Sequence, residues 1–448
     1  MLQTDEDRAA ADCKRNIEAA AKAADASSAL SAYRELKAKG LLINPYIYRV
    51  VINVCANAPN AVDLKTDAFE VFEDMKKNPD SKARADETVF SALIKVCSKS
   101  RDFETCEQLL CEMRSQGVEP RLRTFSSLLT AYSEVGNLSK AVWTHRKLQE
   151  HCIELSESEY IALLRACILQ QSKEDFAAVL KEYTDVVMKP SPAMWDVLKQ
   201  WFESDAACEQ GKKWRSFLEA IDTNGTSSVN GDILGSIELP ESEASALLEK
   251  VEQLVVTDEK RADQWNEYKE WLKVNGPFDI IVDAANVGYF NQNFAGGGFS
   301  YRQIELMVEH YEKQGKKVLI VLHKRRTYDD VVPKEHHELD RNIMFNCRSG
   351  NNDDWYWLYA AIKFGGRTLV VTNDEMRDHH FQMIHTRSLV RWKERHQVHY
   401  SIHCEKQVRT EEPPVYSSRP QRIGDTWHFP SSYSAEWLAF QLEPTREE

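Results

Sequence analysis

The chain has 448 residues, of which 42% are hydrophobic and 28% are charged, and its formal net charge is −13. This length allows two or three domains with their own cores, and no run of 18 apolar residues predicts a membrane span. The first 20 residues are acidic and helix-like, unlike a signal peptide or an Arg- and Ser-rich transit peptide. We therefore expect a location in the nucleus, or in the cytosol, unless a leader was trimmed.

The acidic charge is unevenly distributed along the chain. Counting Lys and Arg against Asp and Glu gives −3 for residues 1–200, −8 for 201–275, +2 for 276–410 and −4 for 411–448. Phosphate binding requires a basic surface only where the phosphates lie, so the overall acidity does not exclude a nucleic-acid partner.

Aromatic residues open helix-like segments at a nearly constant interval over the first 200 residues: Tyr48, Phe90, Phe125, Tyr160 and Trp195. The last three intervals are 35 residues and the first is 42. Each unit has the pattern of two amphipathic helices, which predicts a solenoid whose units bury their faces against their neighbours. The ten cysteines form no CxxC pair, and three recur at one phase of the repeat as predicted buried helix residues: Cys55, Cys97 and Cys167.

The repeat units SALIKVCSKSRDFETCEQLLCEMRSQGVEP and SSLLTAYSEVGNLSKAVWTHRKL resemble pentatricopeptide repeats. The protein-binding alternative, the tetratricopeptide repeat, has a 34-residue period and a different Trp/Leu/Gly/Tyr signature. The resemblance implies RNA binding, in some members with one base read per repeat. The base-reading positions would be Ala92 with Leu122, and Ser127 with Glu157, which are not the expected polar pairs. The resemblance thus implies that the repeats recognise the shape of the RNA rather than its base sequence.

Strand-like apolar runs alternate with helical patterns over residues 276–410, which predicts an α/β domain with a doubly wound parallel sheet. Nearly every position of the strands is apolar, which fits burial on both faces. The flanking segments 201–275 and 411–448 are less regular and partly β-like. We expect these two flanks to fold together as a bridging domain between the α/β domain and a solenoid over residues 1–200.

Aspartates stand at the ends of the strand-like runs in the predicted α/β domain. FDIIVDAAN carries Asp283, LVVTNDEMRDH carries Asp374 and Asp378, and SGNNDDWYWLYAA carries Asp353 and Asp354 at the start of a helix. Each could singly be a helix cap. The carboxyl ends of parallel strands meet at one edge of a sheet, however, and clustered carboxylates suit Mg²⁺ or Mn²⁺. Together they predict a metal-dependent phosphodiesterase.

Two basic stretches accompany the aspartates. The first follows the apolar run KVLIVL and comprises His323, Lys324, Arg325 and Arg326. The second comprises His385, Arg387, Arg391, Lys393, Arg395 and His396. Such a charge run is commonly a solvated helix face, but beside an Asp-rich edge we interpret both stretches as RNA-phosphate contacts.

The motifs VDAANVG, NNDDWYWLYAA, VTNDEMRDH and RWKERHQV are similar to the metallonuclease domain of protein-only ribonuclease P, an NYN/PIN-like nuclease. The repeats and the bridging region match that family's architecture over nearly the whole chain. The resemblance implies removal of the 5′ leader from precursor tRNA, leaving a 5′-phosphate on the tRNA and a 3′-hydroxyl on the leader, without an RNA subunit. It also implies a monomer whose solenoid contacts the tRNA elbow while the nuclease domain reaches the acceptor stem.

By the same resemblance, the catalytic aspartates are Asp283, Asp353, Asp354 and Asp374, and Asp378 is a further metal ligand. Two Mg²⁺ ions about 4 Å apart can activate a water and stabilise the leaving oxygen, and Mn²⁺ can substitute.

The chain departs from the family at the structural zinc site, which usually consists of a CxxC pair with a later His and Cys. The corresponding turn, TNGTSSVNG, has no cysteine, and Ala439 stands where the later Cys is expected. His428 is the one matching ligand, and a single ligand cannot hold a tetrahedral zinc. We therefore expect no structural zinc, and a junction held by packing.

Three other functions remain open on the residues alone. One is an NYN/PIN-type endoribonuclease that acts on other structured RNA. The second is a non-catalytic RNA-binding adaptor, which the intact aspartate set disfavours. The third is a protein scaffold, which would bind no RNA.

Overall fold

The structure is a computed structural model that describes residues 5–40, 43–80, 83–236, 239–293, 298–327, 344–348, 352–376, 387–403 and 406–444. The chain divides into two compact units. One unit comprises Met1–Phe217, Ser431–Ser434 and Leu438–Glu448, and the other comprises Leu218–Pro430 and Ala435–Trp437. Over the described ranges, no helix is long and apolar enough to cross a membrane.

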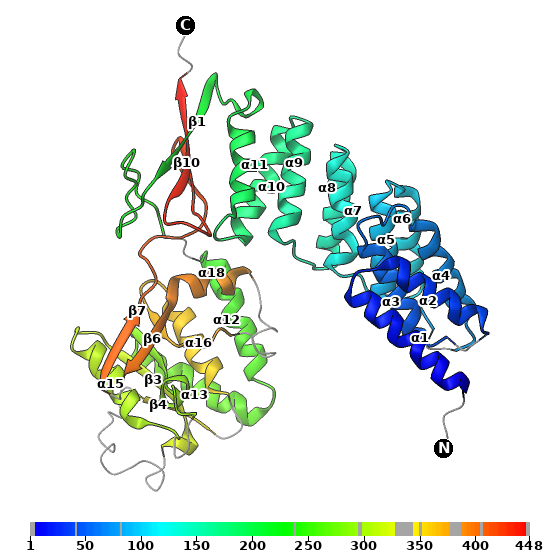
Figure 1. Cartoon of the computed structure of the whole chain (residues 1–448). Coiled ribbons are helices and arrows are strands. Elements are labelled where there is room, and N and C mark those ends of the chain that lie inside the picture. Colours follow the sequence, from blue (N-terminus) through cyan, green and yellow to red (C-terminus); the bar gives the residue numbers. More distant parts are fainter. Residues whose placement is uncertain are drawn as a thin grey trace. The chain divides into compact units, whose positions relative to one another are not determined.

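The first unit contains a row of paired helices (Figure 1). They are α1 (Asp5–Lys22), α2 (Ala26–Ala38), α3 (Pro45–Asn57), α4 (Lys65–Lys77), α5 (Glu87–Lys99), α6 (Phe103–Ser115), α7 (Leu122–Glu134), α8 (Leu138–Glu150), α9 (Glu157–Leu169), α10 (Lys173–Val186) and α11 (Pro192–Phe202). The repeating aromatic residues lie on α3, α5, α7, α9 and α11. The predicted helical solenoid is thus confirmed.

Polar and apolar contacts join successive repeats. Glu87 of α5 is buried, and its carboxylate accepts hydrogen bonds from Thr124 Oγ1 at 2.8 Å and from Arg123 Nε at 2.8 Å, both on α7. Phe72 of α4 packs edge-to-face on Phe90 of α5, with ring centroids 6.2 Å apart. The three repeating cysteines are fully buried, as predicted. Each helix pair therefore buries its apolar face against the next pair.

A six-stranded sheet in the second unit has the order β4-β3-β2-β5-β6-β7. Its strands are β2 (Ile280–Asp283), β3 (Val318–His323), β4 (Met344–Cys347), β5 (Leu369–Val371), β6 (Gln397–His403) and β7 (Gln407–Glu411). All neighbours are parallel except β7, which pairs antiparallel with β6 at the edge. The predicted α/β sheet is confirmed as a mostly parallel one. β4 could not be predicted from sequence, because MFNC has no extended apolar run.

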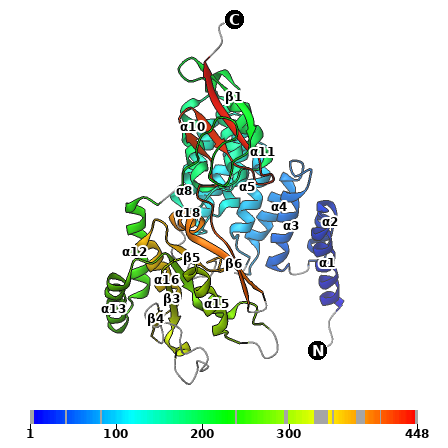
Figure 2. The same cartoon turned by 90° about the vertical axis from the view of Figure 1, so that its left-hand side faces the viewer.

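Helices cover both faces of this sheet (Figure 2). On one face, α15 (Tyr301–Glu312) and the short α14 (Ala284–Tyr289) pack on side chains such as Ile280 and Val282. On the other face, α16 (Asp353–Phe364), α13 (Glu259–Asn275) and α12 (Glu241–Val255) pack on alternate residues such as Ile281. Burial on both faces explains why the central strands β2, β3 and β5 are apolar at nearly every position.

The segments that flank the α/β domain contribute further strands. β1 (Lys212–Glu219) lies beside β10 (Trp437–Pro444), and β8 (Gln421–Ile423) pairs antiparallel with β9 (Thr426–Phe429). Helices α12 and α13 belong to the flank 201–275, and yet they share the core of the α/β sheet. We propose that the nuclease domain includes these helices; the boundaries at residues 200, 275 and 410 remain predictions.

Candidate active site

The central strands β2 and β5 place two aspartates at one edge of the sheet. Asp283 is the last residue of β2 and is buried, with 3% of its surface exposed. It is also the N-cap of α14, because its Oδ1 accepts from the Asn286 amide at 3.1 Å. Asp374 follows the end of β5, and its Oδ1 accepts from the Met376 amide at 2.7 Å. Both residues therefore make the capping or turn contacts expected of aspartates, and they share an edge of the sheet.

Helix α16 brings the next two aspartates to the same place. Asn352 caps this helix, since its Oδ1 accepts from the Asp354 amide at 3.2 Å. The side chains of Asp353 and Asp354 are thus not required as caps, and both are half-buried. Asp354 Oδ1 accepts from the indole nitrogen of Trp357 at 3.3 Å. The aromatic residues of the helix, including Trp357, are buried in the core.

The carboxylates lie close enough to affect one another's ionisation. Burial, followed by the negative charge of Asp354, raises the pKa of Asp283 to about 8. Burial and the charge of Asp353 raise the pKa of Asp354 to about 6. Burial also raises the pKa of Asp353, although His323 and Arg325 oppose this shift. The site therefore gathers carboxyl groups in a poorly solvated environment, where the ionisation of one is opposed by burial and by its neighbours.

This donor set fits a hard cation. The candidates are oxygen donors, and a bound cation would offset the repulsion that raises the pKa of Asp283 and Asp354. Residues 377–386 lie outside the described part of the chain, so the predicted ligand Asp378 has no described position. Within the described part, no three His, Cys, Asp or Glu side chains lie close enough together to hold one metal ion.

The first predicted basic stretch lies directly at this edge. Lys324 and Arg325 are exposed in the short turn η2 (Lys324–Arg326) that follows β3. The guanidinium of Arg326 instead lies over two aromatic rings, 5.1 Å from the centroid of Tyr289 and 4.7 Å from that of Phe299. Lys324 and Arg325 are thus open to solvent beside the aspartates, whereas Arg326 is held against the protein.

The second basic stretch lies on α18 (Arg387–His396). Lys393 Nζ is 2.5 Å from Oε2 of Glu375, the residue after Asp374, so this lysine is brought to the aspartate edge. Arg391 and Arg395 are half-buried on the same helix. His385 and the side chain of Arg387 lie outside the described residues.

Several polar residues of the site were not identified from sequence. Thr372 Oγ1 donates to Asp283 Oδ2 at 2.8 Å and accepts from the Asp374 amide at 3.0 Å. Gln397, the first residue of β6, donates to the carbonyl oxygens of both Thr372 and Asp374. The one signal in the sequence was a hydroxyl residue between the apolar run LVV and Asn-Asp, which is too common to be specific.

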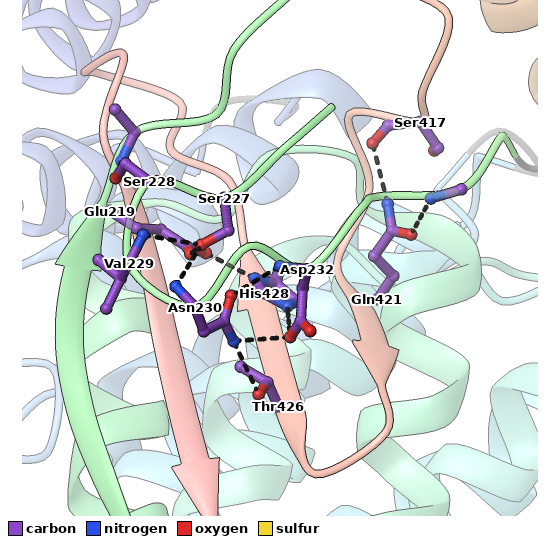
Figure 3. A network of polar contacts seen from close by, with 12 residues as sticks. Glu219, Ser227, Ser228, Val229, Asn230, Asp232, Ser417, Gln421, Thr426 and His428 are labelled. Carbon is purple, nitrogen blue, oxygen red and sulfur yellow. Dashed lines mark hydrogen bonds and ion pairs between the residues drawn. The ribbon is translucent and has the colours of Figure 1, made fainter. Parts of the chain in front are cut away.

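His428 lies in a separate network of polar contacts and is completely buried (Figure 3). Its Nδ1 is 2.6 Å from Oε1 of Glu219, and its Nε2 is 3.2 Å from Oδ2 of Asp232. Ser227 donates to the second oxygen of Glu219, and Asn230 donates to Asp232 at 2.6 Å. Ala439, at the position of the expected cysteine, is fully buried. The contacts of His428 thus include hydrogen bonds to two carboxylates, and the absence of a structural zinc stays a prediction.

Comparison with known proteins accounts for nearly the whole chain. Residues 2–209 match the profile of the pentacotripeptide-repeat region of PRORP, and residues 221–443 match that of protein-only RNase P. The chain belongs to the protein-only RNase P family. As a protein-only RNase P, it is an endonuclease that removes the 5′ leader from precursor tRNA, and its nuclease domain implies metal-dependent catalysis.

Similar members of the family come from Arabidopsis thaliana. Proteinaceous RNase P 1, chloroplastic/mitochondrial, is 28% identical over 96% of this chain and 82% of its own length. Proteinaceous RNase P 2 is 26% identical over 93% of this chain and 88% of its own length. The crystal structure of nuclear proteinaceous RNase P 2 aligns with a TM-score of 0.73 and 26% identity, covering 96% of this chain and 99% of that one. The predicted family, fold and reaction are confirmed.

Proposed function

We propose that Asp283, Asp353, Asp354 and Asp374 catalyse the cleavage of precursor tRNA by binding Mg²⁺, with Asp378 as a further ligand. The observation that carries this proposal is the mutual effect of the carboxylates, which, together with burial, raises the pKa of Asp283 to about 8 and that of Asp354 to about 6. Like charges are costly to gather in a buried place unless a cation offsets them. Mn²⁺, which has similar ligand preferences, can substitute.

The reaction is hydrolysis of one phosphodiester bond. The oxygen of a water forms a bond to phosphorus, and the bond from phosphorus to the leader O3′ breaks. The phosphate remains on the tRNA as a 5′-phosphate, and the leader leaves with a 3′-hydroxyl that receives a proton from the water. Bound Mg²⁺ supplies positive charge that favours ionised water and stabilises the charge on the phosphate and leaving oxygens.

The protein supplies a rigid edge for this chemistry. Asp283 is held on both carboxylate oxygens, by Thr372 and by the Asn286 amide. Asp354 is held by the indole of Trp357. Ligands whose rotamers are set by such contacts lose little freedom when they bind a cation or substrate.

RNA contacts are proposed for the basic residues around the aspartates and for the solenoid. Phosphates would contact the side chains of Lys324, Arg325, Arg326, Arg387, Arg391, Lys393 and Arg395. The solenoid would contact the tRNA elbow and recognise its shape. We also propose that the chain acts as a monomer in the nucleus, although similar family members include both nuclear and chloroplastic/mitochondrial proteins.

Cleavage of a 5′-labelled precursor tRNA by the purified full chain tests the site assignment. We expect one cut at the mature 5′ end in Mg²⁺ and no cut in EDTA. Asp374→Asn should lower the single-turnover rate by orders of magnitude and leave tRNA binding nearly unchanged. Asp279→Asn is the matched control, because Asp279 lies at the opposite end of the β2 segment, where its Oδ2 accepts from the Lys317 amide at 2.8 Å.

Three outcomes would contradict the proposal. Full activity of Asp374→Asn would remove this aspartate from the site. Cuts scattered through unrelated RNAs would favour a general structured-RNA endonuclease. Tight tRNA binding without any cut would favour a non-catalytic adaptor.

A further inference from the structure

We infer that Thr372 is a positioning residue for the cleavage reaction, because its one hydroxyl orients Asp283 and Asp374 together. The inference rests on the proposed function of these two aspartates. Thr372 follows the last residue of β5 and is completely buried, so its hydroxyl is shielded from bulk water. Burial of a hydroxyl group costs free energy unless the group forms hydrogen bonds.

The direction of both hydrogen bonds follows from the chemistry of the partners. Thr372 Oγ1 lies 3.0 Å from the amide nitrogen of Asp374 and 2.8 Å from Oδ2 of Asp283. A backbone amide can only donate, so the hydroxyl accepts from Asp374. Its single proton is then available for Asp283, where it is donated to Oδ2. The same atom thus fixes the backbone that carries one aspartate and the side chain of the other.

The remaining contacts of Asp283 leave room for a further ligand. Its Oδ1 accepts from the Asn286 amide at 3.1 Å, and its Oδ2 accepts from Thr372. Each carboxylate oxygen has two lone pairs, so one on each oxygen is not used by these two bonds. Thr372 and Asn286 therefore define the plane of the carboxylate, and with it the direction in which the free lone pairs point.

The segment that carries the hydroxyl is itself fixed. The amide of Thr372 donates to the Val398 carbonyl at 3.2 Å, and Gln397 Nε2 donates to the carbonyls of Thr372 and Asp374 at 2.9 and 3.1 Å. The Asn373 amide donates to Oδ1 of Asn286 at 3.0 Å. Because threonine is also restricted at χ1, the hydroxyl has little freedom to turn away from Asp283.

Replacement of the hydroxyl by a methyl group tests this role. In the full chain, Thr372→Val should lower kcat for precursor tRNA by about 10- to 100-fold, the usual effect of losing a group that orients a metal ligand. KM should change far less, because Thr372 is fully buried and cannot contact RNA directly. Thr372→Ser, which keeps the hydroxyl, should restore most of the rate. Thr372→Ala, measured in parallel, removes the hydroxyl in a second way and should behave like the valine variant.

Thr368→Val is a matched control at the other end of the same strand. Thr368 lies just before β5 and is buried, and its Oγ1 donates to the Phe278 carbonyl at 2.8 Å. Each of the two threonines thus joins the β5 segment to the β2 segment, but at opposite ends of the strands. We expect Thr368→Val to lower the melting temperature to a similar extent and to leave kcat unchanged.

A readout without RNA separates positioning from general stability. The rise in melting temperature on addition of Mg²⁺ alone should be smaller in Thr372→Val than in the parent chain and in Thr368→Val. Equal kcat and equal Mg²⁺-induced shifts for the two valine variants would overturn the inference, as would a serine variant as impaired as the valine variant. Asp283→Asn is included to test the underlying assignment. If it cleaves normally, the proposed site is wrong; if it is inactive while Thr372→Val is fully active, only the role of Thr372 is wrong.

Discussion

The Nδ1 atom of His428 lies 2.6 Å from Oε1 of Glu219, and both side chains are completely buried. Asp232 approaches the other ring nitrogen at 3.2 Å from a partly exposed position. One imidazole therefore joins two carboxylates that belong to separate segments, the end of β1 and the turn that follows it. Replacing only one partner of such a contact lowers the stability of the fold, because the other group stays buried without its partner.

His428→Leu should lower the free energy of unfolding by about 3 kcal/mol, because it leaves the Glu219 carboxylate buried without its ring partner. Urea unfolding of the full chain measures this loss. The double variant His428→Leu/Glu219→Leu should recover part of it, since no buried carboxylate remains. His399→Leu, at an exposed position on β6, should change the free energy by less than about 0.5 kcal/mol. A loss of that small size for His428→Leu would contradict a stabilising role of the network.

The purified chain should contain much less than one zinc per molecule, since His428 is the one matching ligand position and its nitrogens face Glu219 and Asp232. Elemental analysis of the protein, purified without added zinc or chelator, measures this. A chelator should also leave the melting temperature unchanged in buffer without Mg²⁺. One tightly held zinc per chain would show that ligands outside the matching positions form a site.

Without metal, the nuclease domain should be less stable at pH 8 than at pH 5.5. The pKa of Asp283 rises from its ordinary value of 3.8 to about 8 in the fold, so folding favours its protonated form. The stability associated with that proton is complete below about pH 4 and is lost as the pH rises to about 8. Asp283→Asn should remove this part of the pH dependence and raise the melting temperature of the metal-free chain at pH 8.

Thermal melts of the parent chain and of Asp283→Asn in EDTA, at several pH values, test this expectation. Asp279→Asn is again the control, because this exposed carboxylate lies at the other end of the β2 segment. If the parent chain and Asp283→Asn keep the same difference in melting temperature at every pH, the carboxyl of Asp283 is not protonated in the metal-free fold.

Arg325→Ala should weaken binding of precursor tRNA and make the slope of log affinity against log salt less steep by about one unit. The reason is that Arg325 is exposed in η2 beside the aspartates, where it can neutralise a phosphate. Arg326→Ala should mainly lower the melting temperature, because this side chain lies over the rings of Tyr289 and Phe299. Binding titrations at several salt concentrations distinguish the two. An unchanged salt slope for Arg325→Ala would exclude a phosphate contact.

Local patterns in the sequence predicted much of this molecule. The aromatic residues from Tyr48 to Trp195 repeat at the period of a helix pair, and helix pairs are stabilised by their immediate neighbours, so the solenoid follows from local information. The apolar runs that end at Asp283 and before Asp374 predicted parallel strands with acidic ends, because only buried strands are apolar at nearly every position. The same motifs carried the resemblance to protein-only RNase P, which the comparisons confirmed.

Contacts between residues far apart in the chain were decided only by the tertiary structure. The pairing of Thr372 with Asp283, 89 positions apart, depends on β2 and β5 being adjacent in the sheet, which no local pattern encodes. The packing of α12 and α13 on the nuclease core and the contact of His428 with Glu219 have the same origin. The residue types and their periodicity thus determined the helices, the strands and the acidic edge of the sheet. The order of the strands decided which polar groups meet, because hydrogen bonds depend on distances that sequence separation does not specify.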